Sequence, residues 1–204
     1  MNGPDFVERI ESDLRTELSR LGSSKSLYAD TVGEMEPGAV LTAAADAAAH
    51  ASDTFEQWAE STDQDLFADA SSRVADQYDE VAGELDDHEP GEPPAVAASL
   101  RESETTIERL GATVGWTLVM ERKSTQSSGF FTGQAKPQTA SIFRSFGETY
   151  DTIRDDAVAA LESVCDSDEE WEQAVSAATA VVEAAYDEYF ETLEELGMNP
   201  KPVC

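Results

Sequence analysis

Asp46 and His50 are the residues whose types and spacing best suit metal binding. They stand four positions apart in a predicted helix over 38–60, so both side chains lie on one helix face. A carboxylate and an imidazole in that arrangement are suitable ligands for a transition metal. The pair is therefore the first candidate for chemistry in this chain.

A complete dinuclear site is not indicated. Such sites in helical bundles use two single glutamates and two Glu-x-x-His motifs. Neither of the two histidines, His50 and His88, has a glutamate three positions before it. A reduced site would bind iron or manganese through His50 and Asp46, with Glu17 or Glu80. The alternative is no cofactor, with His50 a buried or half-buried helix histidine hydrogen-bonded to Asp46 or to a nearby serine.

Other catalytic patterns are missing. The segment SSGFFTGQAKP (127–137) has two glycines and a lysine but does not match the P-loop motif. There is no Gly-x-Ser-x-Gly nucleophile motif. The two cysteines, Cys165 and Cys204, form no Cys-x-x-Cys. Cys165 lies in an apolar helical row and is predicted to be a small core residue. Because these catalytic motifs are missing, we expect a protein that is not an enzyme.

The distribution of charge points to a contact surface. The chain has 43 acids and 13 bases, yet residues 109–147 hold one acid and five bases. Acidity elsewhere marks surface that faces water, so this segment is predicted to be core, interface or anion site. The predicted binding residues are aromatic, basic or glycine: Trp116, Arg122, Lys123, Gly129, Phe130, Phe131, Gly133, Lys136 and Arg144. The alternative for the loop is an ordered segment whose Phe130 and Phe131 pack into the bundle.

The acids are dispersed along the chain, and lysine is rare. This pattern favours a protein kept soluble in a salt-rich cytoplasm, where salt screens the repulsion within a chain of formal charge −30. A haloarchaeal source is the first interpretation, and an acidic mesophilic protein is the alternative. The start of the chain, MNGPDFVERIESD, does not resemble a signal peptide. With no long apolar run, we expect a cytoplasmic protein without a membrane partner.

Helical periodicity runs through nearly the whole sequence. It predicts an all-α fold, an antiparallel bundle of about six helices in a single domain over 1–204. The proline-rich stretch 86–94 is the predicted linker, and 123–137 is predicted as a loop. Ser167 and Glu170 form a predicted capping box. The predicted helices cover 4–33, 38–60, 63–86, 95–122, 138–165 and 168–196.

Two segments near the start of the chain carry a resemblance to a known family. LGSSKSLYADTVGE (21–34) and AAADAAAHASDTFEQWAES (43–61) resemble the first two helices of rubrerythrin-type, ferritin-like proteins. In that family a Gly-Glu pair and a Glu-x-x-His motif supply metal ligands. Here Gly22-Ser23 and Ala47 replace the glutamates, and His50 is retained. The resemblance implies a ferritin-like bundle with largely lost metal chemistry.

A second resemblance concerns the segment poor in acids. GWTLVMERK (115–123) and GFFTGQA (129–135) resemble small haloarchaeal proteins described as transcription antitermination proteins. This implies a regulator linked to RNA, for which the bases and phenylalanines would contact phosphates and stack on bases. High salt weakens such binding, so a protein partner or self-association fits better than nucleic acid. Gly111 and Gly115 are predicted to admit another helix closely.

Overall fold

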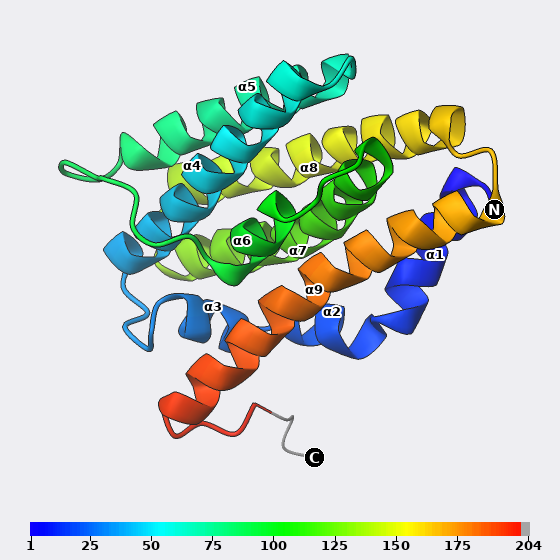
Figure 1. The fold of residues 1–204 in the computed structure, drawn as a ribbon. Coiled ribbons are helices and arrows are strands. Elements are labelled where there is room, and N and C mark those ends of the chain that lie inside the picture. The colour runs from blue at the N-terminus through cyan, green and yellow to red at the C-terminus, as the bar shows by residue number, and fades with distance from the viewer. Residues whose placement is uncertain (201–204) are drawn as a thin grey trace.

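The computed structural model describes residues 1–200, which form α-helices and no strand (Figure 1). The predicted all-α class is confirmed. The predicted count of six helices is corrected, because residues 1–200 form nine. They are α1 (Gly3–Asp13), α2 (Arg15–Leu21), α3 (Ser24–Asp30), α4 (Pro37–Ser61), α5 (Asp65–Ala82), α6 (Ala95–Arg101), α7 (Thr106–Gly133), α8 (Pro137–Val164) and α9 (Asp168–Glu195).

The long helix predicted over 4–33 is three short helices. The backbone leaves helical geometry at Leu14, with φ −106° and ψ 26°, and again at Gly22. The Gly22 carbonyl oxygen accepts a hydrogen bond from Gln126 Nε2 at 2.7 Å, so the second break is held by α7. The apolar spacing persists across both breaks, which is why periodicity alone merges the three helices.

The helix predicted over 95–122 is also divided. α6 ends at Arg101, and α7 begins with a capping box in which Thr105 Oγ1 accepts from the Glu108 N–H at 3.2 Å. The carboxylate of Glu108 accepts in turn from the Thr105 N–H at 2.8 Å. These reciprocal bonds start a new helix where the apolar pattern is uninterrupted.

The loop predicted over 123–137 is helical as far as Gly133. Its serines face the neighbouring helix α8 and are buried, and Ser128 Oγ donates to the Ala140 carbonyl oxygen at 3.0 Å. Ser124 and Ser127 bond to carbonyls of their own helix. Because their hydroxyl groups are hydrogen-bonded in this way, these serines are compatible with the interior of a helix. The turn proper is Gln134–Lys136, where Ala135 has a φ of +55°.

α7 is the central helix of the fold. Every residue from Leu110 to Met120 is buried, so this half of the helix has no solvent-exposed face. Gly111 and Gly115 allow a close approach as predicted, but the helix that approaches is α9 of the same chain. A Cβ at Gly111 would stand 2.8 Å from the Ala174 Cα, and one at Gly115 would stand 2.9 Å from the Ala178 Cα.

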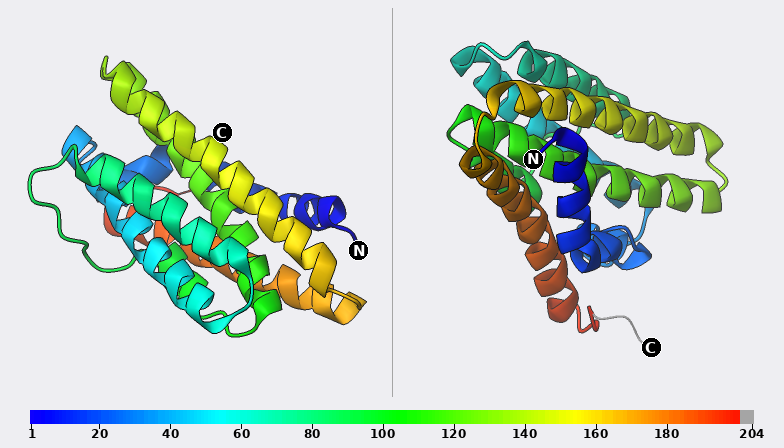
Figure 2. Two further views of the ribbon diagram at one scale, coloured as in Figure 1. Left: turned by 90° about the horizontal axis from the view of Figure 1, so that it is seen from above. Right: turned by 90° about the vertical axis from the view of Figure 1, so that its right-hand side faces the viewer.

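α1 packs against α8 and α9, and α2 and α3 pack against α7 and α9. The Gly3 N–H donates to Glu162 at 2.7 Å, and Arg9 pairs with Glu172. The views in Figure 2 show these helices (blue) on one side of α9 and the α7–α8 hairpin (green to yellow) extending past its neighbours. None of the helices within residues 1–200 combines the length and the apolar character needed to cross a membrane.

Candidate functional site

The outer end of the α7–α8 hairpin, residues 129–145, is called the hairpin tip. Its exposed residues include Gly129, 132–138 and Arg144, and none of them is acidic. In Figure 2 this yellow-green end extends beyond the surrounding helices in both views. The tip is the exposed part of the segment that the charge distribution singles out.

Aromatic packing holds the hairpin tip rigidly. Phe131 and Phe143 stack with ring centres 5.4 Å apart and planes 9° apart. The half-buried Phe130 lies edge-on against Phe131 at 5.2 Å. Helices α7 and α8 are thereby clamped together close to the turn, so the exposed residues are presented from a fixed scaffold.

Two of the predicted binding residues are in the interior. Trp116 and Phe131 each have 0% of their surface exposed. Trp116 lies edge-on against Phe55 at 5.3 Å and against Tyr150 at 5.2 Å, joining α4, α7 and α8. Their placement corrects the prediction for these two side chains, since neither reaches a surface where a partner would contact it.

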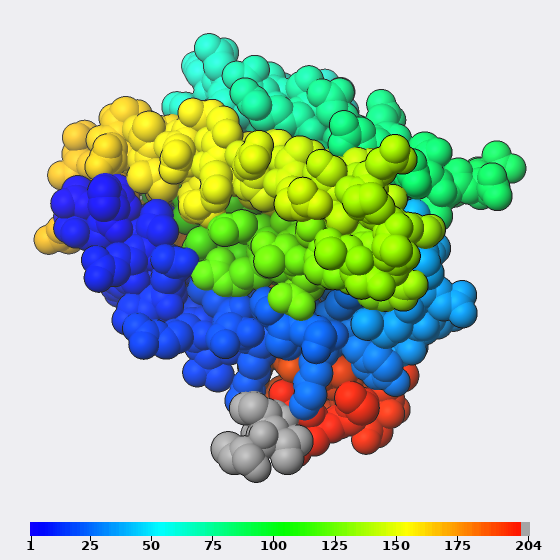
Figure 3. Space-filling model, turned by 180° about the vertical axis from the view of Figure 1, so that it is seen from behind, coloured from blue at the N-terminus to red at the C-terminus, as the bar shows by residue number. Residues whose placement is uncertain are grey.

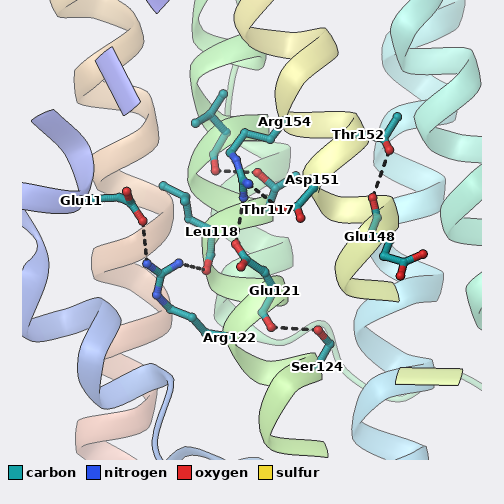
Figure 4. Close-up of polar contacts among 11 residues, drawn as sticks. Glu11, Thr117, Leu118, Glu121, Arg122, Ser124, Glu148, Asp151, Thr152 and Arg154 are labelled. Atoms are coloured by element: carbon teal, nitrogen blue, oxygen red, sulfur yellow. Dashed lines mark hydrogen bonds and ion pairs between the residues drawn. The ribbon is translucent and has the colours of Figure 1, made fainter. Parts of the chain in front are cut away.

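Arg122 and Lys123 are occupied by acids of the N-terminal helices. Figure 4 shows Arg122 reaching Glu11 of α1, 2.8 Å away, while its other nitrogen donates to the Leu118 carbonyl oxygen. Lys123 Nζ lies 2.6 Å from Asp30 Oδ1, with the two side chains 14% and 19% exposed. Both cations therefore fasten α7 to α1 and α3. They are less available for a partner than the sequence suggests.

Glu121, the acid in the 109–147 segment, is also neutralised. Arg154 of α8 donates to Glu121 at 2.9 Å and pairs with Asp151 (Figure 4). Burial alone would lower the pKa of the Arg154 guanidinium, but the two carboxylates raise it above its usual value. Lys136 and Arg144 are different. Both are exposed, and neither has a carboxylate within ion-pair distance in the described chain.

Asp46 and His50 hold a loop in the structure. Asp46 Oδ1 accepts from the Gly91 N–H and from His88 Nε2, both at 3.0 Å. His50 Nε2 donates to the Gly91 carbonyl oxygen at 2.8 Å. The two side chains thus fasten the 83–94 connection to α4. His50 is half-buried as expected, but its partner is Gly91 instead of Asp46 or a serine.

No three His, Cys, Asp or Glu side chains in residues 1–200 are grouped so that they could hold a metal ion. Glu17 and Glu80 lie on α2 and α5, and neither belongs to the Asp46–Gly91–His50 contacts. Sequence reasoning missed the role of His88. Its pairing with Asp46 spans 42 positions, and no local pattern signals it.

Cys165 is half-buried at the end of α8, and burial raises the pKa of its thiol, with Glu170 and Asp166 adding to the effect. A thiol with a raised pKa carries little reactive thiolate, in keeping with a packing role. Cys204 lies outside the described residues.

Comparison with known proteins identifies no matching family model, no similar curated protein and no similar solved structure. We therefore infer the function from the geometry of the site.

Proposed function

We propose that the protein is a cytoplasmic, non-enzymatic interaction protein whose contact surface is the hairpin tip. One observation carries the proposal. From Arg122 to Gly147 the sequence contains no acid, in a chain of formal charge −30, and the hairpin tip exposes the outer part of that stretch. An acid-free exposed surface on such a protein is suited to lie against another molecule.

The partner that this surface favours is an acidic protein, which includes a second copy of the chain. Lys136 and Arg144 are exposed cations without an ion pair in residues 1–200, although Arg144 Nε donates a hydrogen bond to Ser128 Oγ at 3.4 Å. The half-buried Phe130 belongs to the same hairpin tip and supplies an apolar side chain there. Arginine and aromatic side chains are enriched in protein interfaces, and complementary charge sets their orientation.

A photo-crosslinker at Gln138, an exposed position in the tip, tests this proposal in cells. The expected result is one discrete protein adduct that disappears in the double variant Lys136→Glu, Arg144→Glu. The matched control is Arg15→Glu, Arg73→Glu, which makes the same charge change at exposed arginines that have no ion pair in residues 1–200. The control is expected to keep the adduct.

A crosslinker at Gln57, an exposed glutamine on α4, reports non-specific capture. Identical adducts at Gln57 and Gln138, or loss of the adduct in both double variants, would refute the proposed contact surface. An adduct of twice the chain mass that contains only this protein identifies self-association.

The ferritin-like architecture belongs to the same proposal. Its support is the arrangement of two helical hairpins side by side, α4 with α5 and α7 with α8 (Figure 1).

A rubrerythrin-like iron or manganese site at Asp46 and His50 is the rival function. It predicts stoichiometric metal in protein purified in molar KCl, measured by elemental mass spectrometry, and its loss in His50→Ala.

The third candidate is an RNA-linked antitermination regulator. Its support is the same pair of exposed cations without an ion pair in residues 1–200, Lys136 and Arg144, in a tip that also holds Phe130. It predicts nucleic acid that co-purifies at molar salt and leaves in the Lys136→Glu, Arg144→Glu variant. The contribution of counterion release to binding falls as the salt concentration rises. Nucleic acid that stays bound in molar salt would therefore need contacts beyond those to its phosphates.

A further inference from the structure

A cavity of about 300 Å³ lies between α3, α4, α7, α8, α9 and the segment just before α6. Ligand pockets in proteins begin at about this size, and a dry cavity of about 150 Å³ already accepts benzene. The space therefore suits a molecule of two fused or linked rings. Most of its wall is apolar, including Leu27, Val40, Val96, Met120, Phe143 and Phe146.

One polar side chain in the wall has no partner. Tyr150 lines the cavity with 3% of its surface exposed, and its ring is fixed edge-on against Trp116. No hydrogen bond to its hydroxyl is present within residues 1–200. Burial raises the pKa of this phenol, so it stays protonated. The hydroxyl of this cavity-lining tyrosine has no protein acceptor in residues 1–200, so it can donate to a ligand oxygen.

The charges around the cavity disfavour an anion. The wall contains four acidic residues, Asp30, Asp46, Glu92 and Glu188, and one basic residue, Lys123, which is already paired with Asp30. Glu188 accepts from the Ala95 N–H at 2.9 Å and so remains a fixed carboxylate at the edge. A carboxylate or phosphate on the ligand would meet this excess of like charge.

We propose that this cavity binds an uncharged, mainly apolar small molecule of about two rings whose oxygen accepts a hydrogen bond from Tyr150. The proposal does not rest on the contact surface at the hairpin tip, because the residues that line the cavity are distinct from Lys136 and Arg144. The proposal specifies three properties of the ligand: its size, its lack of charge and an oxygen that accepts a hydrogen bond from Tyr150.

Prodan is the probe for the first test. It is an uncharged two-ring naphthalene with a ketone, and its fluorescence shifts to the blue when it leaves water and again when its ketone loses a hydrogen bond. We expect saturable binding of one prodan per chain. In Tyr150→Phe, which retains the ring, we expect affinity to fall about three- to tenfold and the emission of bound prodan to move further to the blue.

A pair of matched variants locates the binding site. Ala44 lines the cavity from α4, and Ala49, five residues later on the same helix, does not, although both are half-buried. Ala44→Trp should fill the cavity and weaken prodan binding more than tenfold, while Ala49→Trp should leave it within about twofold. Circular dichroism of each variant confirms that the helices are retained.

The charge preference is tested with two dyes that differ by one sulfonate. N-phenyl-1-naphthylamine is uncharged, and 1-anilinonaphthalene-8-sulfonate carries the same rings with a negative charge. We expect the uncharged dye to bind at least tenfold more tightly. The proposal is overturned by non-saturable prodan binding, by equal weakening in the two tryptophan variants, by unchanged affinity and emission in Tyr150→Phe, or by equal binding of the two dyes.

Discussion

Replacing Gly115 by alanine tests the close packing of α7 against α9. The added Cβ would lie 2.9 Å from the Ala178 Cα and still closer to its carbonyl oxygen. Both atoms belong to backbone, so no rotation of a side chain can relieve the overlap. The two helices would have to separate by several tenths of an ångström, which disturbs the packing around the buried half of α7.

The expected change in stability is the difference of two opposing effects. Overpacking a well-packed core costs about 1–3 kcal/mol, and more where backbone must move. Alanine for glycine within a helix gives back about 1 kcal/mol. We therefore expect Gly115→Ala to lower the free energy of unfolding by about 1–2 kcal/mol. The measurement is urea unfolding in molar KCl, followed by circular dichroism at 222 nm.

Gly129→Ala is the matched control on the same helix. Gly129 is exposed, and a Cβ there would have no heavy atom within 4 Å. Only the helix-propensity effect remains, so this variant should be more stable than the wild type by up to about 1 kcal/mol. If Gly115→Ala and Gly129→Ala stabilise the protein equally, the close approach of α7 and α9 is wrong.

Three further perturbations follow from contacts in the structure. Asp30→Asn leaves Lys123 unpaired in a largely buried site and should lower the free energy of unfolding by about 2 kcal/mol, which adding Lys123→Met should largely restore; urea unfolding checks both, and a loss that the second change does not reduce would contradict the pairing. Asp46→Ala removes the acceptor that holds the 83–94 connection, so cleavage there by a glutamate-specific protease should be about tenfold faster, and an unchanged rate would refute this role. In the capping box, the Thr105 N–H and then the Gln173 side chain lower the pKa of Glu108 below its ordinary value of 4.5, so the unfolded chain takes up a proton more readily than the folded one. Stability should therefore fall as pH drops below about 4.5, and unfolding measured from pH 6 to 3 should show a shallower fall in Glu108→Gln, whereas equal slopes would contradict this assignment.

The long helices could be predicted because their signals are local. α4, α8 and α9 begin and end within one residue of the ranges expected from periodicity, and the capping box of Ser167 with Glu170 is present. The helical stretch over 123–133 could not be predicted in this way. Its serines and glycines are typical of loops, and the burial of Ser124, Ser127 and Ser128 depends on neighbouring helices that the local sequence does not reveal.

The features of the candidate site also fall into those that local sequence reveals and those that depend on long-range contacts. The acid-free stretch can be read from the sequence, and Lys136 and Arg144 are exposed in the structure, while their role in binding stays a prediction. The burial of Trp116 depends on three helices meeting, and the pairing of Arg122 with Glu11 spans 111 positions. Such long-range contacts leave no periodic trace in a sequence. The cavity beside Tyr150 was not predicted, because it is a space enclosed by six separate parts of the chain.

The attachment of α1–α3 to C-terminal parts of the chain affects how the chain can fold during synthesis. Gly3 binds Glu162, Arg9 binds Glu172 and the Lys25 ammonium donates to the Asn199 carbonyl oxygen at 2.8 Å (Figure 3 shows α1, dark blue, beside α8, yellow). A ribosome adds about 5–20 residues each second, so the N-terminal helices wait for roughly ten seconds or more before these partners exist. During that interval their apolar faces are open to chaperones, whereas the α7–α8 hairpin can close as soon as it emerges.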